Sequence, residues 1–380
     1  MAAFGRYKSV VCGINFCFFR TITQRSNFGK TDFSATEAIK RTPPCHAQNI
    51  ALRKNKKNAT MHAMRIVAFF TMLSSVLLLG NCQQTYAGNA YRRAGAPVIH
   101  TQTPIPNQAT SAYYNTAANP LIPTRPLAQP ALPAPKPRWA KAVCVMDPRT
   151  GRVLYGYNEN ERRQVASIQK IITALCICDA GDMNHLITIK KEDWEKTGKT
   201  WLSQIAPGEQ YTRGAMLRAM LTGSFNNVAY ALARDAAGSE AAFANRMNAR
   251  ARRMKMHNSH FANPHGLPGP QYSTARDMAI AGCYAYVNPI IRTCVDAPSY
   301  HFILNNGKTR TMGNTNKLLH RADMQWVNGM KTGYTNAAGH CLVSSGTLNG
   351  RAVVVVVLGC PNRNSLWKES EKYLRWAMNM

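Results

Sequence analysis

The sequence predicts an α/β protein of the α+β type, in which a mainly antiparallel five-stranded sheet carries an inserted lobe of helices. Two apolar, strand-like segments lie within residues 140–157, and three more lie within residues 325–358. The residues between these two groups have mainly helical spacing of apolar side chains. We therefore expect the two ends of the folded region to meet in one sheet, with helices on its faces.

Apolar spacing and turn residues define the individual elements. The last two strands are joined at Asn349-Gly350, a dipeptide that favours a two-residue hairpin turn. A second hairpin is expected around Asn306-Gly307. The expected strands are 140–146, 152–157, 186–190, 301–304, 308–312, 325–332, 340–345 and 351–358. Six helices are expected: one that starts at Ser167, one over 212–222, one that ends at 236, one from a Ser239 cap to 256, one from a Ser273 cap to 286, and one over 364–378.

The chain upstream of these elements has a different character. Residues 1–60 are basic and show no sustained apolar period, so we expect no folded domain there. Residues 61–90 have the order of a secretory signal peptide, namely a basic start, an apolar run and small residues. We therefore expect translation to start at Met61 or Met64. The alternative is a long basic extension that precedes an uncleaved membrane anchor.

Residues 91–137 are rich in Pro, Ala, Thr and Asn, which predicts a disordered, extended linker. The folded domain is expected at residues 138–380, which carry 31 Lys/Arg and 16 Asp/Glu. The whole chain has a net charge of +29, which favours anionic envelope polymers or a membrane surface as further partners. No zinc-finger spacing or RNA-binding aromatic motif accompanies this charge, so nucleic acid is not expected.

The eleven cysteines contain no Cys-x-x-Cys pair, and we expect no metal site. Seven of them lie in the expected domain, and the sequence assigns no disulfide among them. Cys176, Cys178 and Cys341 fall in apolar segments, and we expect them to be buried free thiols.

Ser167 and Lys170 form the first candidate site. A serine hydroxyl is a poor nucleophile until a base takes its proton, and a lysine one helical turn away can act only if its amine is neutral. Burial or a nearby cation provides this, and the flanking residues are apolar. The pair alone is weak evidence, because a helix-start serine and a solvated lysine give the same pattern.

Two further motifs strengthen the interpretation. Ser224-Phe225-Asn226 follows 57 residues after Ser167, and Lys331-Thr332-Gly333 follows after a further 107. In this order the motifs resemble those of serine-type D-Ala-D-Ala carboxypeptidases, the low-molecular-mass penicillin-binding proteins of peptidase family S11, which share their fold with β-lactamases. The resemblance spans residues 138–380 and includes segments 147–155, 263–267, 273–278 and 329–339.

The resemblance implies a role for each motif. Ser167 attacks the carbonyl between two D-alanines and becomes the acyl-enzyme, and Lys170 takes its proton. Ser224 relays a proton to the leaving amine, and Asn226 holds Lys170 and the substrate amide. Substrate binding falls to Lys331, Thr332, Gly333 and Tyr334. Lys331 and Thr332 attract the terminal carboxylate, Gly333 lets the substrate backbone approach, and the backbone N–H groups of Ser167 and Tyr334 form an oxyanion hole.

The resemblance also implies peptidoglycan stem peptides as substrates, β-lactams as inhibitors, no cofactor, and export to the periplasm or cell envelope. Three positions depart from the family pattern. Phe225 stands where a small residue is usual, and we expect it to narrow the groove or stack on the substrate. Asn227 stands where Asp is common. Gln169 replaces a frequent Thr, with little expected effect. His265 is expected to be structural.

Two other functions remain open. A D,D-endopeptidase that cuts peptide cross-links uses the same residues, and a non-catalytic wall-binding protein would use the basic surface. A class A β-lactamase needs a glutamate to activate water. Glu240 is the only glutamate between Ser224 and Lys331, and it lies on an expected helix. We therefore expect slow turnover of β-lactams.

Overall fold

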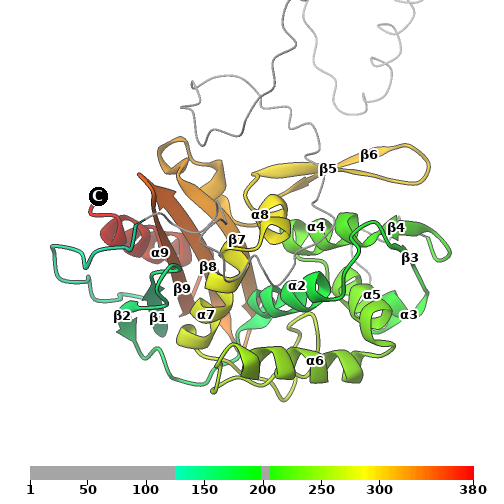
Figure 1. The fold of residues 1–380 in the computed structure, drawn as a ribbon, viewed down its shortest axis with the longest axis horizontal. Coiled ribbons are helices and arrows are strands. Elements are labelled where there is room, and N and C mark those ends of the chain that lie inside the picture. The colour runs from blue at the N-terminus through cyan, green and yellow to red at the C-terminus, as the bar shows by residue number, and fades with distance from the viewer. Residues whose placement is uncertain (1–124, 198–205) are drawn as a thin grey trace, which may run out of the picture. The chain divides into compact units, whose positions relative to one another are not determined.

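The computed structural model of the chain describes residues 125–197 and 206–380, whose ribbon is coloured in Figure 1. The expected extension at 1–60, the expected signal peptide at 61–90 and the linker residues 91–124 lie outside the described residues. In the part of the chain that is described, no helix has the length and apolar character needed to cross a bilayer.

A five-stranded antiparallel sheet forms the centre of the fold, which confirms the prediction. β1 pairs with β9, so the two ends of the folded region meet in the middle of the sheet. β8 and β9 are joined at Asn349-Gly350, where both residues have the positive φ that this hairpin turn requires. In order across the sheet the strands are β2 (Val153–Tyr157), β1 (Ala142–Met146), β9 (Arg351–Cys360), β8 (Gly339–Leu348) and β7 (Val327–Thr335).

Each face of the sheet has its own hydrophobic core. β9 is a nearly continuous run of valines because both of its faces are covered. Val354 and Val356 belong to the core beneath the inserted helices, whereas Val353 and Val355 belong to the core beneath the C-terminal helix. Figure 1 shows this layered arrangement. The helix nearest the sheet on one face is α7 (Ala275–Tyr286), on which α2 (Lys170–Asp179) packs, and on the other face it is α9 (Arg363–Ala377).

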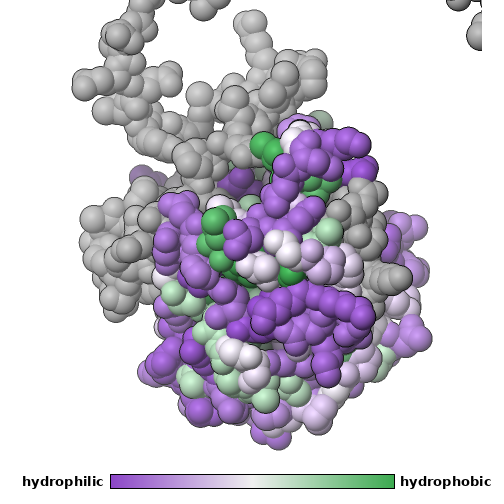
Figure 2. All heavy atoms as spheres, turned by 90° about the vertical axis from the view of Figure 1, so that its right-hand side faces the viewer, coloured by the Kyte–Doolittle hydropathy of each residue, from purple (hydrophilic) through white to green (hydrophobic). Residues whose placement is uncertain are grey.

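The inserted lobe lies between β2 and β7 in the chain and turns a mainly hydrophilic surface to solvent (Figure 2). Besides α2 and α7, it contains α3 (Glu192–Glu195), α4 (Arg213–Gly223), α5 (Asn226–Ala237), α6 (Glu240–Arg253), α8 (Pro289–Val295), the hairpin of β3 (Leu186–Thr188) and β4 (Gln210–Thr212), the hairpin of β5 (Ser299–Ile303) and β6 (Thr309–Gly313), and the 3-10 turns η2 (Ala166–Gln169), η4 (Lys317–His320) and η5 (Ala322–Met324). The short elements α3, β4 and α8 were not predicted.

One expected helix cap is confirmed and one is wrong. Gly238 ends α5 in a left-handed conformation, and the Ser239 hydroxyl caps α6 by accepting from the Ala242 N–H. The expected cap at Ser273 is wrong. Thr274 caps α7, since its hydroxyl accepts from the Asp277 N–H at 3.0 Å. The Ser273 hydroxyl lies instead 2.8 Å from that of Ser259.

The described cysteines are free thiols, and Cys176, Cys178 and Cys341 are buried, as expected. Burial raises the pKa of the Cys176 thiol to about 12 and that of Cys341 to about 11. These thiols are therefore uncharged at neutral pH, and they contribute to the core as small apolar groups.

The end of the Pro-rich segment, residues 125–137, packs against the domain. Leu127 is only 1% exposed, and its N–H donates to Asp147 Oδ2 at 3.0 Å. Further along, the Tyr373 hydroxyl of α9 donates to the Pro135 carbonyl at 2.8 Å. The packed part of the chain therefore begins upstream of Arg138, where we expected the domain to start.

Leu127→Ala is expected to lower the free energy of unfolding by about 2–5 kcal/mol, because it empties a buried site. Urea denaturation of the full chain measures this change. Leu132→Ala is the matched control, since Leu132 is 74% exposed in the same segment, and it should change stability by less than about 0.5 kcal/mol. Equal effects of the two substitutions would contradict the packing of this segment.

Candidate active site

Ser167 lies in the turn η2, directly before α2, and Lys170 is the first residue of α2. The residue before the serine, Ala166, has a φ of 51°, which is uncommon for a residue other than glycine. This turn brings Lys170 Nζ to 2.8 Å from Ser167 Oγ. The lysine is fully buried and the serine is partly exposed, so the hydroxyl is the accessible member of the pair.

The Lys170 amine has three polar partners. Besides Ser167, it contacts Asn226 Oδ1 at 2.7 Å and the backbone carbonyl of His265. A neutral amine has two hydrogens to donate and one lone pair. The two oxygens of Asn226 and His265 only accept, so they take the hydrogens and leave the lone pair for the Ser167 hydroxyl. This arrangement suits a base that receives the serine proton.

Burial and a second cation favour the neutral form of the Lys170 amine. Burial is the larger cause and lowers its pKa well below the ordinary value, and the positive charge of Lys331 lowers the pKa further. Lys331 lies on β7 and is also fully buried, which lowers its own pKa to about 7. The pair therefore contains a lysine free to act as a base and a second lysine that carries charge below neutral pH.

Ser224 and Asn226 flank the junction between α4 and α5. Ser224 ends α4 in a left-handed conformation with φ of 66°, and its N–H donates to the Met220 carbonyl at 3.0 Å. Two residues later, Asn226 begins α5 and reaches Lys170. The sharp turn at Ser224 thus places the second motif beside the first.

β7 brings the third motif to the nucleophile. It is an edge strand of the sheet, so one side can pair with an extended ligand. A Cβ added at Gly333 would lie 2.9 Å from the backbone nitrogen of Ser167, so this approach requires glycine. The Thr332 hydroxyl donates to that of Thr315 at 2.8 Å. Tyr334 is half-exposed at the rim of the site and stacks on His340.

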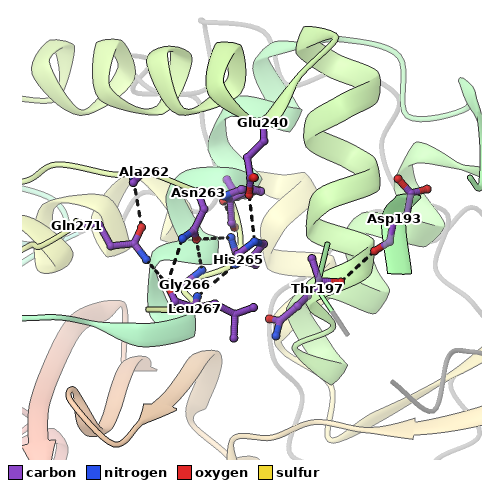
Figure 3. Close-up of polar contacts among 12 residues, drawn as sticks. Asp193, Thr197, Glu240, Ala262, Asn263, His265, Gly266, Leu267 and Gln271 are labelled. Carbon is purple, nitrogen blue, oxygen red and sulfur yellow. Dashed lines mark hydrogen bonds and ion pairs between the residues drawn. The ribbon is translucent and has the colours of Figure 1, made fainter. Parts of the chain in front are cut away.

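Sequence reasoning missed the role of the turn at residues 263–266. The imidazole of His265 is buried and lies 3.1 Å from Glu240, as Figure 3 shows. Burial lowers the pKa of His265, and its Nδ1 accepts from the Leu267 N–H. The functional atom is the backbone carbonyl of His265, which accepts from Lys170 and lies 3.2 Å from Ser167 Oγ.

Gly266, the residue after His265, shows how closely this turn packs against the segment that carries Ser167. Gly266 has a φ of 84°, and a Cβ there would lie 2.3 Å from the Ala166 carbonyl oxygen. No L-residue with a side chain fits this position without moving the nucleophile segment. Thr315, the partner of Thr332, was also missed, because a single hydroxyl in a loop has no distinctive pattern.

The structure corrects the expectation for Phe225. Its side chain is only 4% exposed and belongs to the hydrophobic core of the lobe, so it neither lines a groove nor stacks on a substrate. Its ring occupies space left by Gly223, where an added Cβ would lie 2.1 Å from Phe225 Cε2. Asn227, the other departure in this motif, is buried as well.

Comparison with known proteins decides the family. The model of the peptidase S11 family, D-alanyl-D-alanine carboxypeptidase, matches residues 131–362. The chain belongs to this family. D-alanyl-D-alanine carboxypeptidase DacC of Escherichia coli K12 is 33% identical over 249 residues, which cover 63% of this chain and 61% of that protein.

Further similar proteins are named as an endopeptidase, a carboxypeptidase and a transpeptidase. A D-alanyl-D-alanine endopeptidase of Pseudomonas aeruginosa is 31% identical over 239 residues, 62% of this chain and 76% of that one. The crystal structure of D-alanyl-D-alanine carboxypeptidase from Mycobacterium tuberculosis H37Rv matches with a TM-score of 0.61 and 28% identity, covering 67% of this chain and 96% of that chain. The Streptomyces K15 DD-transpeptidase matches with a TM-score of 0.60 and 26% identity, covering 66% and 100%.

The chain spans about three fifths of the length of the carboxypeptidases of Escherichia coli and Bacillus subtilis that it matches. The solved structures that match are of penicillin-binding and DD-peptidase proteins, which agrees with the predicted fold class. Across residues 125–197 and 206–380, no group of three or more His, Cys, Asp or Glu side chains is gathered as metal ligands would be.

The packing of Phe225 on Gly223 can be tested with a double-mutant cycle. Gly223→Ala is expected to lower the free energy of unfolding by about 1–3 kcal/mol, because the new methyl group meets the phenyl ring. In a Phe225→Ala background the same change should be neutral or stabilising, since Ala is the better helix former. Urea denaturation of the four proteins gives the coupling. An equal cost in both backgrounds would mean that the ring lies elsewhere.

Proposed function

We propose that this S11 protein is a serine D-Ala-D-Ala carboxypeptidase that trims peptidoglycan stem peptides through an acyl-enzyme. The observation that carries the proposal is a fully buried lysine amine of lowered pKa, 2.8 Å from a partly exposed serine hydroxyl. Only a neutral amine can accept the serine proton, and the site provides both the burial and the neighbouring cation that keep it neutral.

The proposed reaction has two halves. Lys170 takes the proton of Ser167 as Oγ attacks the carbonyl between the two D-alanines. The tetrahedral oxyanion is stabilised by the backbone N–H groups of Ser167 and Tyr334. The proton then passes through Ser224 to the amine of the departing D-alanine. D-Alanine is released, and the rest of the peptide stays bound to Ser167 as the acyl-enzyme. A water molecule attacks the ester, releases the shortened peptide and restores the serine hydroxyl.

The remaining site residues are proposed to bind substrate. Lys331 and Thr332 attract and hydrogen-bond the terminal carboxylate, and the absence of a side chain at Gly333 lets the substrate backbone lie along the edge of β7. Asn226 holds Lys170 on one side and the substrate amide on the other. The closeness of Gly333 to Ser167 supports this placement, because it aligns the strand edge with the nucleophile.

β-Lactams are proposed to acylate Ser167, and hydrolysis of the resulting adduct is proposed to be slow. Glu240, the glutamate considered for activating the deacylating water, lies at the start of α6 with Oε1 3.1 Å from the His265 imidazole. Its carboxylate therefore supports the turn rather than a water beside Ser167. This contact favours a long-lived penicilloyl adduct over β-lactamase activity.

The location and organisation of the chain are proposed from its sequence and family. We infer that residues 61–90 direct export, that residues 138–380 hold the catalytic residues, and that the protein works in the periplasm or cell envelope. Anionic envelope polymers or the membrane surface are proposed as further partners of a chain with a net charge of +29.

A D,D-endopeptidase that cuts cross-links is the second candidate, because relatives with that name match over 62% of the chain. The two activities differ in substrate rather than in catalytic residues. The third candidate, a wall-binding protein without catalysis, would not need a buried neutral lysine against a serine.

Labelling of the full chain with a fluorescent penicillin, beside Ser167→Ala, tests the proposal. We expect covalent labelling of the wild type and none of the variant, because the adduct forms on Oγ. Hydrolysis of a stem pentapeptide is then compared with hydrolysis of a cross-linked dimer. Faster release of D-alanine supports the carboxypeptidase, and faster cleavage of the dimer supports the endopeptidase. A folded wild type that takes no label would contradict both enzymes.

The pH dependence of acylation tests the charge coupling. Acylation should fall at low pH as Lys170 becomes protonated and loses its lone pair. A positive neighbour disfavours a second positive charge, so Lys331→Met should raise the pKa of Lys170 and move this midpoint to higher pH by roughly one unit. Lys317→Met removes an exposed charge on η4 and should leave the midpoint unchanged. A midpoint that stays or falls in Lys331→Met would contradict the coupling.

A further inference from the structure

Gln169 is a buried amide between the nucleophile and the turn at residues 263–266. Its side chain is 1% exposed, although the sequence places it next to Lys170 in a motif where its identity was expected to matter little. Its Nε2 lies 2.6 Å from the Asn263 carbonyl, 3.2 Å from Asn263 Oδ1 and 3.1 Å from Gln271 Oε1. All three partners are oxygens, so the position requires a hydrogen-bond donor.

The two partners of Gln169 hold the backbone of the turn. Asn263 Oδ1 accepts from the N–H groups of His265 at 3.2 Å and Gly266 at 2.8 Å. Asn263 Nδ2 and Gln271 Nε2 both donate to the Leu267 carbonyl, at 3.1 and 2.6 Å. Figure 3 shows these side chains converging on the turn. The amide network therefore fixes the backbone on both sides of His265.

The amide network positions the backbone carbonyl oxygen of His265, which lies beside the two reacting side chains. The His265 carbonyl oxygen accepts from Lys170 Nζ and lies 3.2 Å from Ser167 Oγ. With Asn226 it occupies both hydrogens of the neutral amine, which directs the lone pair at the serine. A shift of this carbonyl would let the amine rotate, and misplacement by about 1 Å is enough to cost roughly a hundredfold in rate.

We propose that Gln169 is a positioning residue for acylation, because its amide holds the turn that presents the His265 carbonyl to Lys170. This inference rests on the proposed function, since it assigns Gln169 to the step in which Lys170 takes the proton of Ser167. The Gln169 amide donates to Asn263 and Gln271, and it acts on the turn through these two side chains.

Gln169→Met is the direct test, because methionine has a similar length and donates no hydrogen bond. The second-order rate constant for acylation of the full chain by a fluorescent penicillin is measured across pH, with the folded fraction followed by circular dichroism in the same buffers. We expect acylation to fall roughly ten- to hundredfold with the fold intact. The low-pH midpoint should also move to lower pH, because the carbonyl that favours protonated Lys170 is withdrawn.

Asn288→Ala is the matched control. Asn288 is another fully buried amide, and it caps α8 by accepting from the Ile291 N–H at 3.1 Å. Its loss should reduce stability but leave the acylation rate of the folded protein and its midpoint unchanged. Gln271→Met removes a second member of the network and should change rate and midpoint in the same direction as Gln169→Met, so it replaces that variant if Gln169→Met does not fold.

The outcomes separate the inference from the function on which it rests. A labelled wild type, with folded Gln169→Met and Gln271→Met acylating at the wild-type rate and midpoint, overturns the positioning role and leaves the enzyme intact. A rate loss that follows the unfolded fraction at every pH also overturns it, because that is the effect of stability alone. A folded wild type that takes no label removes the proposed function and this inference together.

Discussion

The burial of the Lys170 amine is the constraint on which the rest of the structure depends. A lysine in water is protonated at neutral pH, and burial among apolar side chains lowers the pKa of Lys170 well below the ordinary lysine value. Burial alone would leave polar hydrogens without partners, which is costly. The fold therefore delivers two acceptor oxygens, from Asn226 and the His265 carbonyl, and a second buried cation, Lys331, from the far end of the chain.

These groups meet because the topology brings distant segments to one edge of the sheet. β1 and β9 join the chain ends, which carries β7 to the start of α2. Two segments of the inserted lobe contact the Lys170 amine, namely the junction of α4 and α5 and the turn containing His265. Two glycines, Gly266 and Gly333, allow backbone to touch backbone around Ser167. The site is thus assembled by close contacts of main chain as much as by side chains.

The fold was largely predictable because its signals are local. The valine run of β9, the turn at Asn349-Gly350 and the spacing of Ser167 and Lys170 each depend on neighbouring residues. The parts that were missed depend on contacts between distant residues. The carbonyl of His265 has no signature in residue type, and the burial of Phe225 depends on the space above Gly223. The choice of Thr274 over Ser273 as a cap depends on Ser259, and the packing of Leu127 depends on Asp147.

The packed segment at residues 125–137 has a consequence for how the domain is held. Leu127 belongs to the core shared with α9, whereas Ala166 and Ile168, beside the nucleophile, belong to the core on the opposite face of the sheet. The Ala131 N–H also donates to the side chain of Asn379, next to the C-terminus. A pull on residue 125 would therefore be borne by the α9 face of the sheet rather than by the core that holds the nucleophile.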